Sequence, residues 1–255
     1  MDVKRYAAEQ YDTSERLERR ISIHEKYSVN QQGFGSWIAA HYALRPGMRI
    51  LELGCGTGEM WKSEWRRLEG SRLLLSDLSP GMIETARRNL SGVPQIEFQV
   101  IDIQQIPFED VSFDSVIANM MLYHVPDIPT ALTEVRRVLK PNGIFYCATY
   151  GENGMIDYLF RRLPRLKKGS QTNNAFTLQN GAGLLKRHFG HVERDLYPDE
   201  LRVTNLDDLV DYIYSLSSMT GLTPEDRGDL RSDLEALAEN GVLTIPKEYG
   251  LFMSW

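Results

Sequence analysis

The sequence predicts an α/β fold built on a parallel sheet, and three observations carry this prediction. Between Met48 and Thr149, short apolar runs alternate with amphipathic segments, which is the pattern of β-α-β units. Several of these runs are apolar on both faces, as strands covered by helices on both sides must be. The first run ends in the glycine-rich bend "LGCGTG", where a strand is expected to pass directly into a helix.

The apolar runs give the expected strands in chain order, at residues 48–53, 72–77, 96–102, 113–119 and 143–149. Helices are expected between them. One begins at Ser79-Pro80, because a capping residue followed by proline is typical of a first helical turn. Another lies within residues 127–143, where Leu132, Val135, Val138 and Leu139 share one face and Pro-Asn-Gly ends the helix.

The alternation stops after Thr149. Residues 150–174 are rich in glycine, asparagine and basic side chains, so an insertion over one edge of the sheet is expected. The remaining elements are expected as a helix at 176–190, a strand at 191–198, helices at 205–218 and 223–240, and a final strand at 248–255.

Composition narrows the class of protein. With 255 residues, 42% hydrophobic and 25% charged, the chain is typical of a globular protein with a sizeable core. A net charge of -6 argues against general affinity for nucleic acid or anionic membrane. Cys55 and Cys147 have no spacing typical of a metal site or disulfide framework, so a reducing cytoplasm is favoured and no metal is expected. No segment has the length and apolarity of a membrane span or a leader.

The glycine bend predicts a ligand that needs bare backbone, and the sequence excludes two candidates. A phosphate-binding P-loop requires Lys-Ser/Thr after its second glycine, and none follows. A dinucleotide fingerprint would place its third glycine or alanine at Glu59, whose bulk and charge would crowd the helix and repel a pyrophosphate. Because the third glycine is Gly58, a ligand without phosphates fits better.

The bend "ELGCGTG" resembles the first motif, Glu/Asp-x-Gly-x-Gly-x-Gly, of class I S-adenosylmethionine (SAM) dependent methyltransferases, in particular the type 11 methyltransferase-domain family. Three later stretches agree in order: "SDLSPGM" with Asp77, "IDIQQIPFEDVSFDSVIAN" with Asp102, and "VRRVLKPNGIF". In the last stretch Asn142 replaces the first glycine of the family's Pro-Gly-Gly, at a turn that tolerates asparagine. The match covers residues 45–150.

The resemblance implies a Rossmann-like seven-stranded sheet with its last strand antiparallel and helices on both faces. It also implies an N-terminal helical lid and a small inserted cap. On this interpretation the whole chain, 1–255, is one methyltransferase domain. Its parts are the lid at 1–44, the SAM-binding core at 45–150, the cap at 151–188, and C-terminal strands and helices at 189–255.

The resemblance also implies a set of cofactor-binding residues. Asp77 would hold the ribose hydroxyls, and Asp102 would accept from the adenine amino group, with Ile103 packed on the ring. A carboxylate at the end of a strand suits such donors, although Asp77 could instead cap a helix and Asp102 begin a loop. The full expected set is Tyr27, Glu52, Gly54, Cys55, Gly56, Thr57, Gly58, Asp77, Leu78, Met82, Asp102, Ile103, Asn119 and Met120.

Candidates for catalysis follow the fourth expected strand. His124 is the candidate general base, because imidazole titrates near neutrality, and Tyr123 is a second candidate. Alternatively, His124 only fixes the loop and Tyr123 only forms a wall. In the N-terminal segment, Arg20, His24 and Tyr27 share a helical face that either contacts the cofactor as part of a lid or is a solvated face.

The function expected is methyl transfer from SAM, giving S-adenosylhomocysteine, to a small-molecule N, O or C nucleophile, mainly through proximity and desolvation. Alternatives are a tRNA or protein methyltransferase, a SAM-binding protein without turnover, and a nicotinamide-dependent oxidoreductase. The basic run from Arg161 to Lys168 is the feature that would attract nucleic acid, but such a run is more often a solvated helix face. A cytoplasmic monomer or homodimer is expected.

Overall fold

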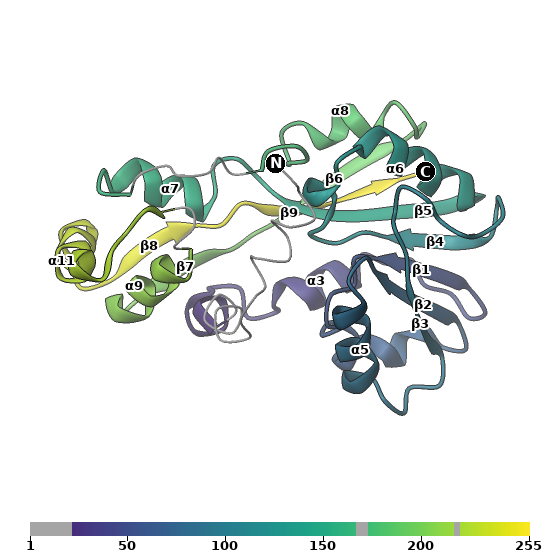
Figure 1. Ribbon diagram of the computed structural model, residues 1–255, viewed down its shortest axis with the longest axis horizontal. Coiled ribbons are helices and arrows are strands. Elements are labelled where there is room, and N and C mark those ends of the chain that lie inside the picture. The colour runs from purple at the N-terminus through teal and green to yellow at the C-terminus, as the bar shows by residue number, and fades with distance from the viewer. Residues whose placement is uncertain (1–21, 167–172, 217–219) are drawn as a thin grey trace. The chain divides into compact units, whose positions relative to one another are not determined.

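The computed structural model describes residues 22–166, 173–216 and 220–255, and the chain divides into two compact units (Figure 1). The sheet unit comprises Phe34–Tyr150, Ala175–Tyr197 and Gly250–Trp255. The helical unit takes its described residues from Met1–Gly33, Gly151–Asn174 and Pro198–Tyr249. The stretch 151–188, expected as one cap, therefore divides between the two units near residue 174.

The sheet unit is built on seven strands in the order β3-β2-β1-β4-β5-β9-β6. The pairs β1-β2, β1-β4, β2-β3 and β4-β5 are parallel. His191, before β6, and Trp255, after β9, exchange backbone hydrogen bonds of 3.0 and 3.1 Å, so β9 runs antiparallel to β6. The predicted seven-stranded, Rossmann-like sheet is confirmed. Its strands are β1 Arg49–Leu53, β2 Arg72–Asp77, β3 Ile96–Val100, β4 Phe113–Ile117, β5 Leu139–Tyr150, β6 Val192–Tyr197 and β9 Tyr249–Ser254.

The helices of the sheet unit begin where capping chemistry predicts. In α5, Pro80–Asn89, the Ser79 side chain accepts from the Met82 amide, and in α6, Ile128–Val138, Asp127 accepts from the Thr130 amide at 3.1 Å. The buried face of α6 packs into the core under β4 and β5. The other helices are α3 Phe34–Ala40, α4 Trp61–Glu64, η1 Trp65–Leu68, η2 Leu122–His124 and α8 Gly181–Leu185.

The helix predicted at 176–190 was wrong in extent, because α8 covers only Gly181–Leu185. The Asn180 side chain accepts from the Thr177 amide at 2.8 Å, and the Leu178 amide donates to the Tyr150 carbonyl at 3.0 Å. These bonds hold the preceding residues in a turn, since asparagine side chains compete with helical hydrogen bonds.

The helical unit has its own core, which includes Ile23, Leu159, Ile213 and Leu230. Residues 22–27 are helical. The two helices predicted after residue 204 are confirmed. The antiparallel pair β7, Glu200–Val203, and β8, Leu243–Pro246, was not predicted. The helices are α7 Met155–Arg162, α9 Leu206–Ser215, η3 Pro224–Asp226 and α11 Arg227–Leu237.

The length and hydropathy of a helix decide whether it could cross a membrane. Over the ranges that the structure describes, none of the helices combines the length and the apolar character that crossing a bilayer requires.

Candidate active site

The bend after β1 adopts a backbone that only glycine accepts readily. Gly54, Gly56 and Gly58 have φ values of +72°, +55° and +69°. A Cβ atom on Gly54 would lie 2.7 Å from Met121 Cγ, and one on Gly58 would lie 2.9 Å from Leu90 Cδ1. Around Gly56, by contrast, no atom lies within 4 Å of that position. Gly54 and Gly58 thus allow close packing, whereas Gly56 leaves open space beside the backbone.

Asp77, the last residue of β2, is hydrogen-bonded to this bend. Its Oδ2 accepts from the Gly56 amide at 3.0 Å, and its Oδ1 accepts from the Ser79 amide at 2.9 Å. The Cys55 amide donates to the Ser76 carbonyl at 2.9 Å. The carboxylate therefore does more than support the start of α5: it also fixes the glycine bend, at the carboxyl edge of the sheet where α/β proteins bind ligands.

Two further members of the expected cofactor set lie in the bend. The Thr57 carbonyl accepts from Asn89 Nδ2 at 3.0 Å, which ties the bend to α5. The Cys55 Sγ donates to the Gly56 carbonyl at 3.6 Å, and burial raises the pKa of this thiol. A thiol held protonated is a poor nucleophile, so Cys55 is a structural part of the bend.

A buried polar cluster lies behind the bend. Glu52, 5% exposed, accepts from the indole Nε1 of Trp61. Burial and, to a lesser extent, the charge of Asp77 raise the pKa of Glu52 and the Trp61 hydrogen bond lowers it, which leaves a pKa of about 7. Asn119 Nδ2 donates to the Tyr42 hydroxyl at 2.6 Å. Sequence reasoning missed Trp61 and Tyr42; a tryptophan directly after the glycine bend was the one available signal.

Asn119 also carries an acceptor that the protein leaves unused. Its Oδ1 is buried and has no hydrogen-bond partner among the described residues. A buried amide oxygen without a donor is costly, so such an atom commonly marks a place where a ligand or water donates. The next residue, Met120, has a φ of +52°, and backbone strain of this kind is concentrated at functional sites.

The residues expected around adenine differ in their exposure and in their hydrogen bonds. Asp102 Oδ1 accepts from the Gln104 amide at 2.9 Å and from the Gln104 side chain at 3.2 Å. Leu78 is 47% exposed beside Asp77, and Met82 is half-buried. Ile103 is buried in the hydrophobic core. An exposed leucine next to a strand-end carboxylate suits a flat apolar ligand surface, whereas Ile103 presents little surface to one.

His124 and its neighbours form an aromatic group at the end of β4. The ring of Tyr123 lies 4.4 Å from the ring of His124 and 4.7 Å from that of Tyr150. The Nδ1 atom of His124 is buried without a partner among the described residues, and burial lowers the pKa of this histidine below 6.5. The imidazole is therefore neutral at pH 7 and able to accept a proton.

Tyr27 belongs to the helical unit, unlike the other candidates. Its hydroxyl donates to Asp208 Oδ2 at 2.6 Å, and burial together with this bond raises the pKa of Tyr27 to about 12. His24 of the same helix is buried, with a pKa lowered to about 4 by that burial. Arg20, the third residue of the expected face, lies outside the described residues.

Two arginines of the basic run pair with carboxylates. Arg161 pairs with Asp157 at 2.6 Å, and Arg165 pairs with Asp233 at 2.9 Å and with Asp229 at 3.2 Å. Lys167 and Lys168 lie outside the described residues. Over residues 22–166, 173–216 and 220–255, no group of three or more His, Cys, Asp or Glu side chains is arranged to hold a metal ion.

Comparison with known proteins shows what this chain is similar to. The family model described as "Methyltransferase domain" matches residues 51–147, from β1 through the glycine bend to β5. The chain is 29% identical over 191 residues to malonyl-[acyl-carrier protein] O-methyltransferase of Yersinia pestis, covering 75% of this chain and 64% of that protein. It is 33% identical over 137 residues to demethylmenaquinone methyltransferase of Symbiobacterium thermophilum, covering 49% and 55%. The chain thus spans less than two thirds of the length of these relatives.

Solved structures share the fold. Phosphoethanolamine N-methyltransferase 2 of Haemonchus contortus, solved in complex with S-adenosyl-L-methionine, superposes with a TM-score of 0.61 at 16% identity. The superposition covers all of this chain and 60% of that one. At this identity the likeness establishes the arrangement of strands and helices.

Proposed function

Because the chain belongs to the class I SAM-dependent methyltransferases, we propose that it transfers a methyl group from SAM to a small-molecule nucleophile. The observation that carries the proposal is the left-handed bend at Gly54, Gly56 and Gly58, fixed by Asp77. This bend presents bare backbone and open space at the edge of the sheet where α/β proteins bind ligands.

The residues present fit SAM at three places. Open space beside Gly56 admits a ligand against the backbone. Asp77 offers carboxylate oxygens to a ribose diol, next to the exposed Leu78 for an adenine ring. The buried Oδ1 of Asn119 has no donor within the described part of the chain, and an ammonium group would supply one, while Glu52 lies buried behind the same bend. Asp102, Met82 and Met120 complete the proposed cofactor site, while Ile103 and Tyr27 contribute least.

When bound, SAM supplies an electrophilic methyl group on a sulfonium. The chain's own residues then have to orient the acceptor and exclude water. The ring group of Tyr123, His124 and Tyr150 provides an apolar wall at the end of β4. His124 is neutral at pH 7, so it accepts a proton from an acceptor that carries one. Tyr123 shapes the wall rather than reacting.

The acceptor is proposed as a small molecule with an N, O or C nucleophile. The names of the two relatives, malonyl-[acyl-carrier protein] O-methyltransferase and demethylmenaquinone methyltransferase, support this class without selecting a compound. Nucleic acid as acceptor is disfavoured, because Arg161 and Arg165 already bind carboxylates and the chain carries a net charge of -6.

Transfer of a labelled methyl group tests this proposal. The full chain is incubated with methyl-labelled SAM and, in parallel, with a metabolite extract, total tRNA and a protein extract. Label in the metabolite fraction is expected. Label confined to tRNA or protein would overturn the acceptor class, and bound SAM with no labelled product in any fraction would favour a SAM-binding protein without turnover.

A further inference from the structure

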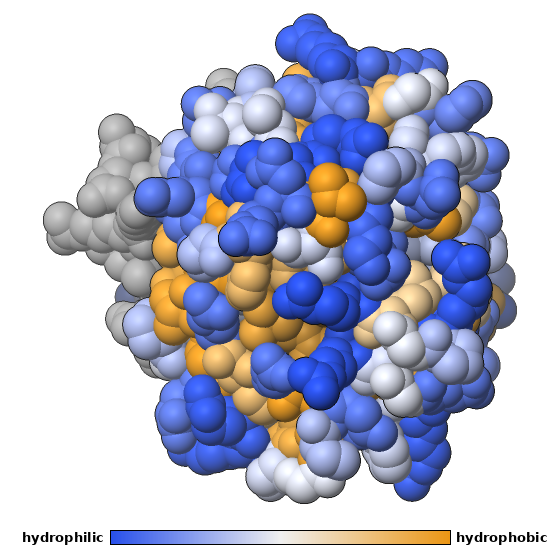
Figure 2. All heavy atoms as spheres, turned by 90° about the vertical axis from the view of Figure 1, so that its right-hand side faces the viewer, coloured by the Kyte–Doolittle hydropathy of each residue, from blue (hydrophilic) through white to orange (hydrophobic). Residues whose placement is uncertain are grey.

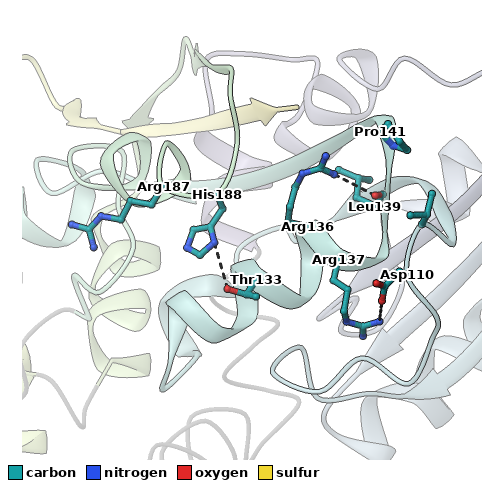
Figure 3. A pocket seen from close by; sticks show the side chains of 9 residues that line it. Asp110, Thr133, Arg136, Arg137, Leu139, Pro141, Arg187 and His188 are labelled. Atoms are coloured by element: carbon teal, nitrogen blue, oxygen red, sulfur yellow. Dashed lines mark hydrogen bonds and ion pairs between the residues drawn. The ribbon is translucent and has the colours of Figure 1, made fainter.

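A second concave site lies at the opposite, amino edge of the sheet. The groove has a volume of about 560 Å³, within the range of roughly 300–1,000 Å³ typical of small-molecule sites. It is formed by the loop before β4, the last two turns of α6, the start of β5, and the residues after α8. These side chains are drawn in Figure 3; they are Asp110, Val111, Thr133, Arg136, Arg137, Leu139, Pro141, Arg187 and His188.

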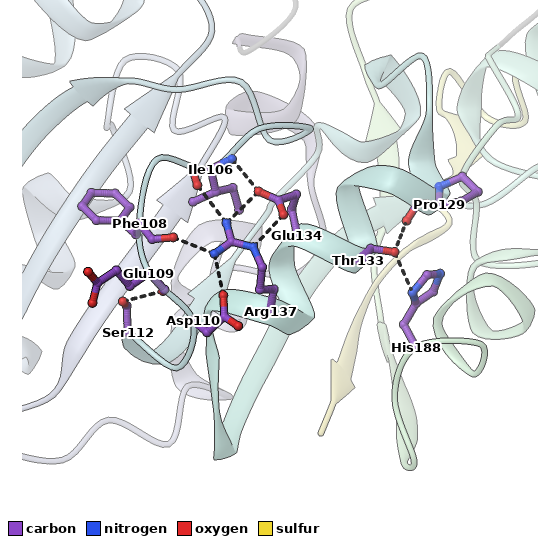
Figure 4. A network of polar contacts seen from close by, with 10 residues as sticks. All are labelled: Ile106, Phe108, Glu109, Asp110, Ser112, Pro129, Thr133, Glu134, Arg137 and His188. Atoms are coloured by element: carbon purple, nitrogen blue, oxygen red, sulfur yellow. Dashed lines mark hydrogen bonds and ion pairs between the residues drawn. The ribbon is translucent and has the colours of Figure 1, made fainter.

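The groove is basic in a chain that is acidic overall. Three arginines line it against a single aspartate. Arg137 is fully engaged: it binds Glu134 at 2.7 and 2.8 Å, Asp110 at 3.0 Å, and the carbonyls of Ile106 and Phe108 (Figure 4). Both Asp110 and Glu134 thus pair with Arg137.

The other two arginines have no carboxylate partner among the described residues. The single hydrogen bond of Arg136 runs from Nη1 to the Leu139 carbonyl at 3.3 Å, which offsets the negative end of α6. Arg187 is exposed and extends away from the other labelled side chains in Figure 3. The groove therefore has uncompensated positive charge on two of its sides.

His188 adds a polar contact between the two arginines. Its Nδ1 lies 3.5 Å from Thr133 Oγ1, and that hydroxyl already donates to the Pro129 carbonyl at 3.0 Å. Thr133 and Arg136 are three residues apart on α6 and so share a face. His188 and Arg136 both line the groove: His188 lies beside Thr133, and the Arg136 side chain turns toward Leu139 (Figure 3).

The rest of the lining is apolar and includes one strained residue. Val111 is 50% exposed with a φ of +58°, an unfavourable conformation for a β-branched side chain. Its amide donates to the Arg137 carbonyl at 2.9 Å, which holds it in place. Pro141 is exposed, whereas Leu139 is 1% exposed and presents little side-chain surface to the groove. Figure 2 shows a face of the molecule that is mostly hydrophilic, with a smaller apolar area.

We propose that this groove binds a small organic phosphomonoester, separately from the methyl-transfer site. Arg136 and His188 hold the phosphate, Arg187 attracts it from the rim, and Val111 and Pro141 contact the organic part. Guanidinium groups are the preferred partners of phosphate oxygens, and a dianion matches two cations without carboxylate partners. No covalent step is involved.

Phenyl phosphate, which combines a phosphate with an apolar ring, is the probe. The full chain is titrated at constant ionic strength while the imidazole resonances of its histidines are followed by NMR. The His188 resonance is assigned from its absence in His188→Gln. The polar and charged groups that line the groove with this ring are Thr133, Arg136, Arg137, Arg187 and Asp110. A bound phosphate is expected to raise the pKa of His188, which burial and Arg187 otherwise lower.

A saturable shift of His188 with phenyl phosphate is expected, with affinity about 10-fold weaker in Arg136→Gln and in Arg187→Gln. Arg88→Gln is the matched control, since Arg88 also stands in the last turn of a surface helix, α5. Equal shifts in Arg136→Gln and Arg88→Gln, or an equal shift with phenol or chloride, would overturn the proposal. Inorganic phosphate binding as tightly as phenyl phosphate would overturn the role of the apolar wall.

Discussion

The carboxylate of Asp77 accepts a hydrogen bond from the backbone amide of Gly56, 3.0 Å away, and so joins the end of β2 to the bend after β1. A second bond, from the Ser79 amide at 2.9 Å, fixes the other oxygen. Since both strands end at the same edge of the sheet, the charge of Asp77 is held beside bare backbone before any ligand arrives. Preorganisation of this kind lowers the entropic cost of binding.

The two glycines Gly56 and Gly58 are expected to respond differently to alanine. Gly58→Ala combines an unfavourable φ with a contact to Leu90, and should lower the free energy of unfolding by about 2 kcal/mol or more. Gly56→Ala has only the unfavourable φ and should cost about 1 kcal/mol. Its new methyl group would occupy the open space, so S-adenosylhomocysteine binding should weaken. Urea unfolding and calorimetry measure the two effects, and normal binding by Gly56→Ala would contradict the proposed position of the ligand.

Glu52 should make stability depend on pH. Because its pKa is about 7 in the folded chain against 4.5 unfolded, its contribution is fully present below pH 4.5 and is lost as pH rises to about 7. Glu52→Gln removes this dependence. The free energy of unfolding of the variant, relative to the parent, should therefore rise by up to about 3 kcal/mol between pH 4.5 and 7.5.

The exposed Glu59→Gln serves as the control for Glu52, since Glu59 lies in the same bend and pairs only with Lys62 at the surface. The same relative change in both variants would show that the buried position of Glu52 has no special effect.

His124 is expected to act as the base for protonated acceptors. Its lowered pKa predicts that kcat falls only below about pH 6.5, where the imidazole becomes charged. His124→Ala should lower kcat by about 100-fold and remove this acidic limb, with unchanged affinity for S-adenosylhomocysteine. A kcat within a few-fold of the parent would leave proximity and exclusion of water as the whole contribution of the protein.

Arg137 should stabilise the fold more than its neighbour Arg136. Its guanidinium connects α6 to the loop before β4 through Glu134, Asp110 and two carbonyls. Arg137→Ala should lower the free energy of unfolding by about 2–3 kcal/mol, because it leaves several of these groups unpaired. Arg136→Ala, with one carbonyl contact, should cost less than about 1 kcal/mol. Equal losses in urea unfolding would contradict this distinction.

The sequence predicted the central strands well because their apolar runs are long and end at glycine, aspartate or asparagine. It predicted β5 too short, from 143 instead of Leu139, because Pro141-Asn142-Gly143 indicates a turn. In the structure the chain stays extended through these residues, with a shift in the pairing register between Phe113 and Ser115. The pair β7-β8 was missed because two four-residue strands far apart in sequence give no local signal.

For the candidate site, the sequence predicted the residues at the ends of strands. It did not predict the side chains from other elements that contact those residues. Asp77 and the three glycines follow from motif spacing. The contacts of Trp61 with Glu52, and of Tyr42 with Asn119, depend on packing between elements and have no spacing rule. The same holds for the groove at Arg136 and His188, which only the fold brings together.

The most direct test of the central claim is calorimetric titration of the parent chain and of Asp77→Ala with S-adenosylhomocysteine and, separately, with NADH. Mass action makes a ligand that binds only the folded chain raise its melting temperature, which gives a parallel readout. We predict binding of S-adenosylhomocysteine at one site by the parent, loss of that binding in a folded Asp77→Ala, and no binding of NADH. Binding of NADH alone, or unchanged binding of S-adenosylhomocysteine by Asp77→Ala, would contradict the account.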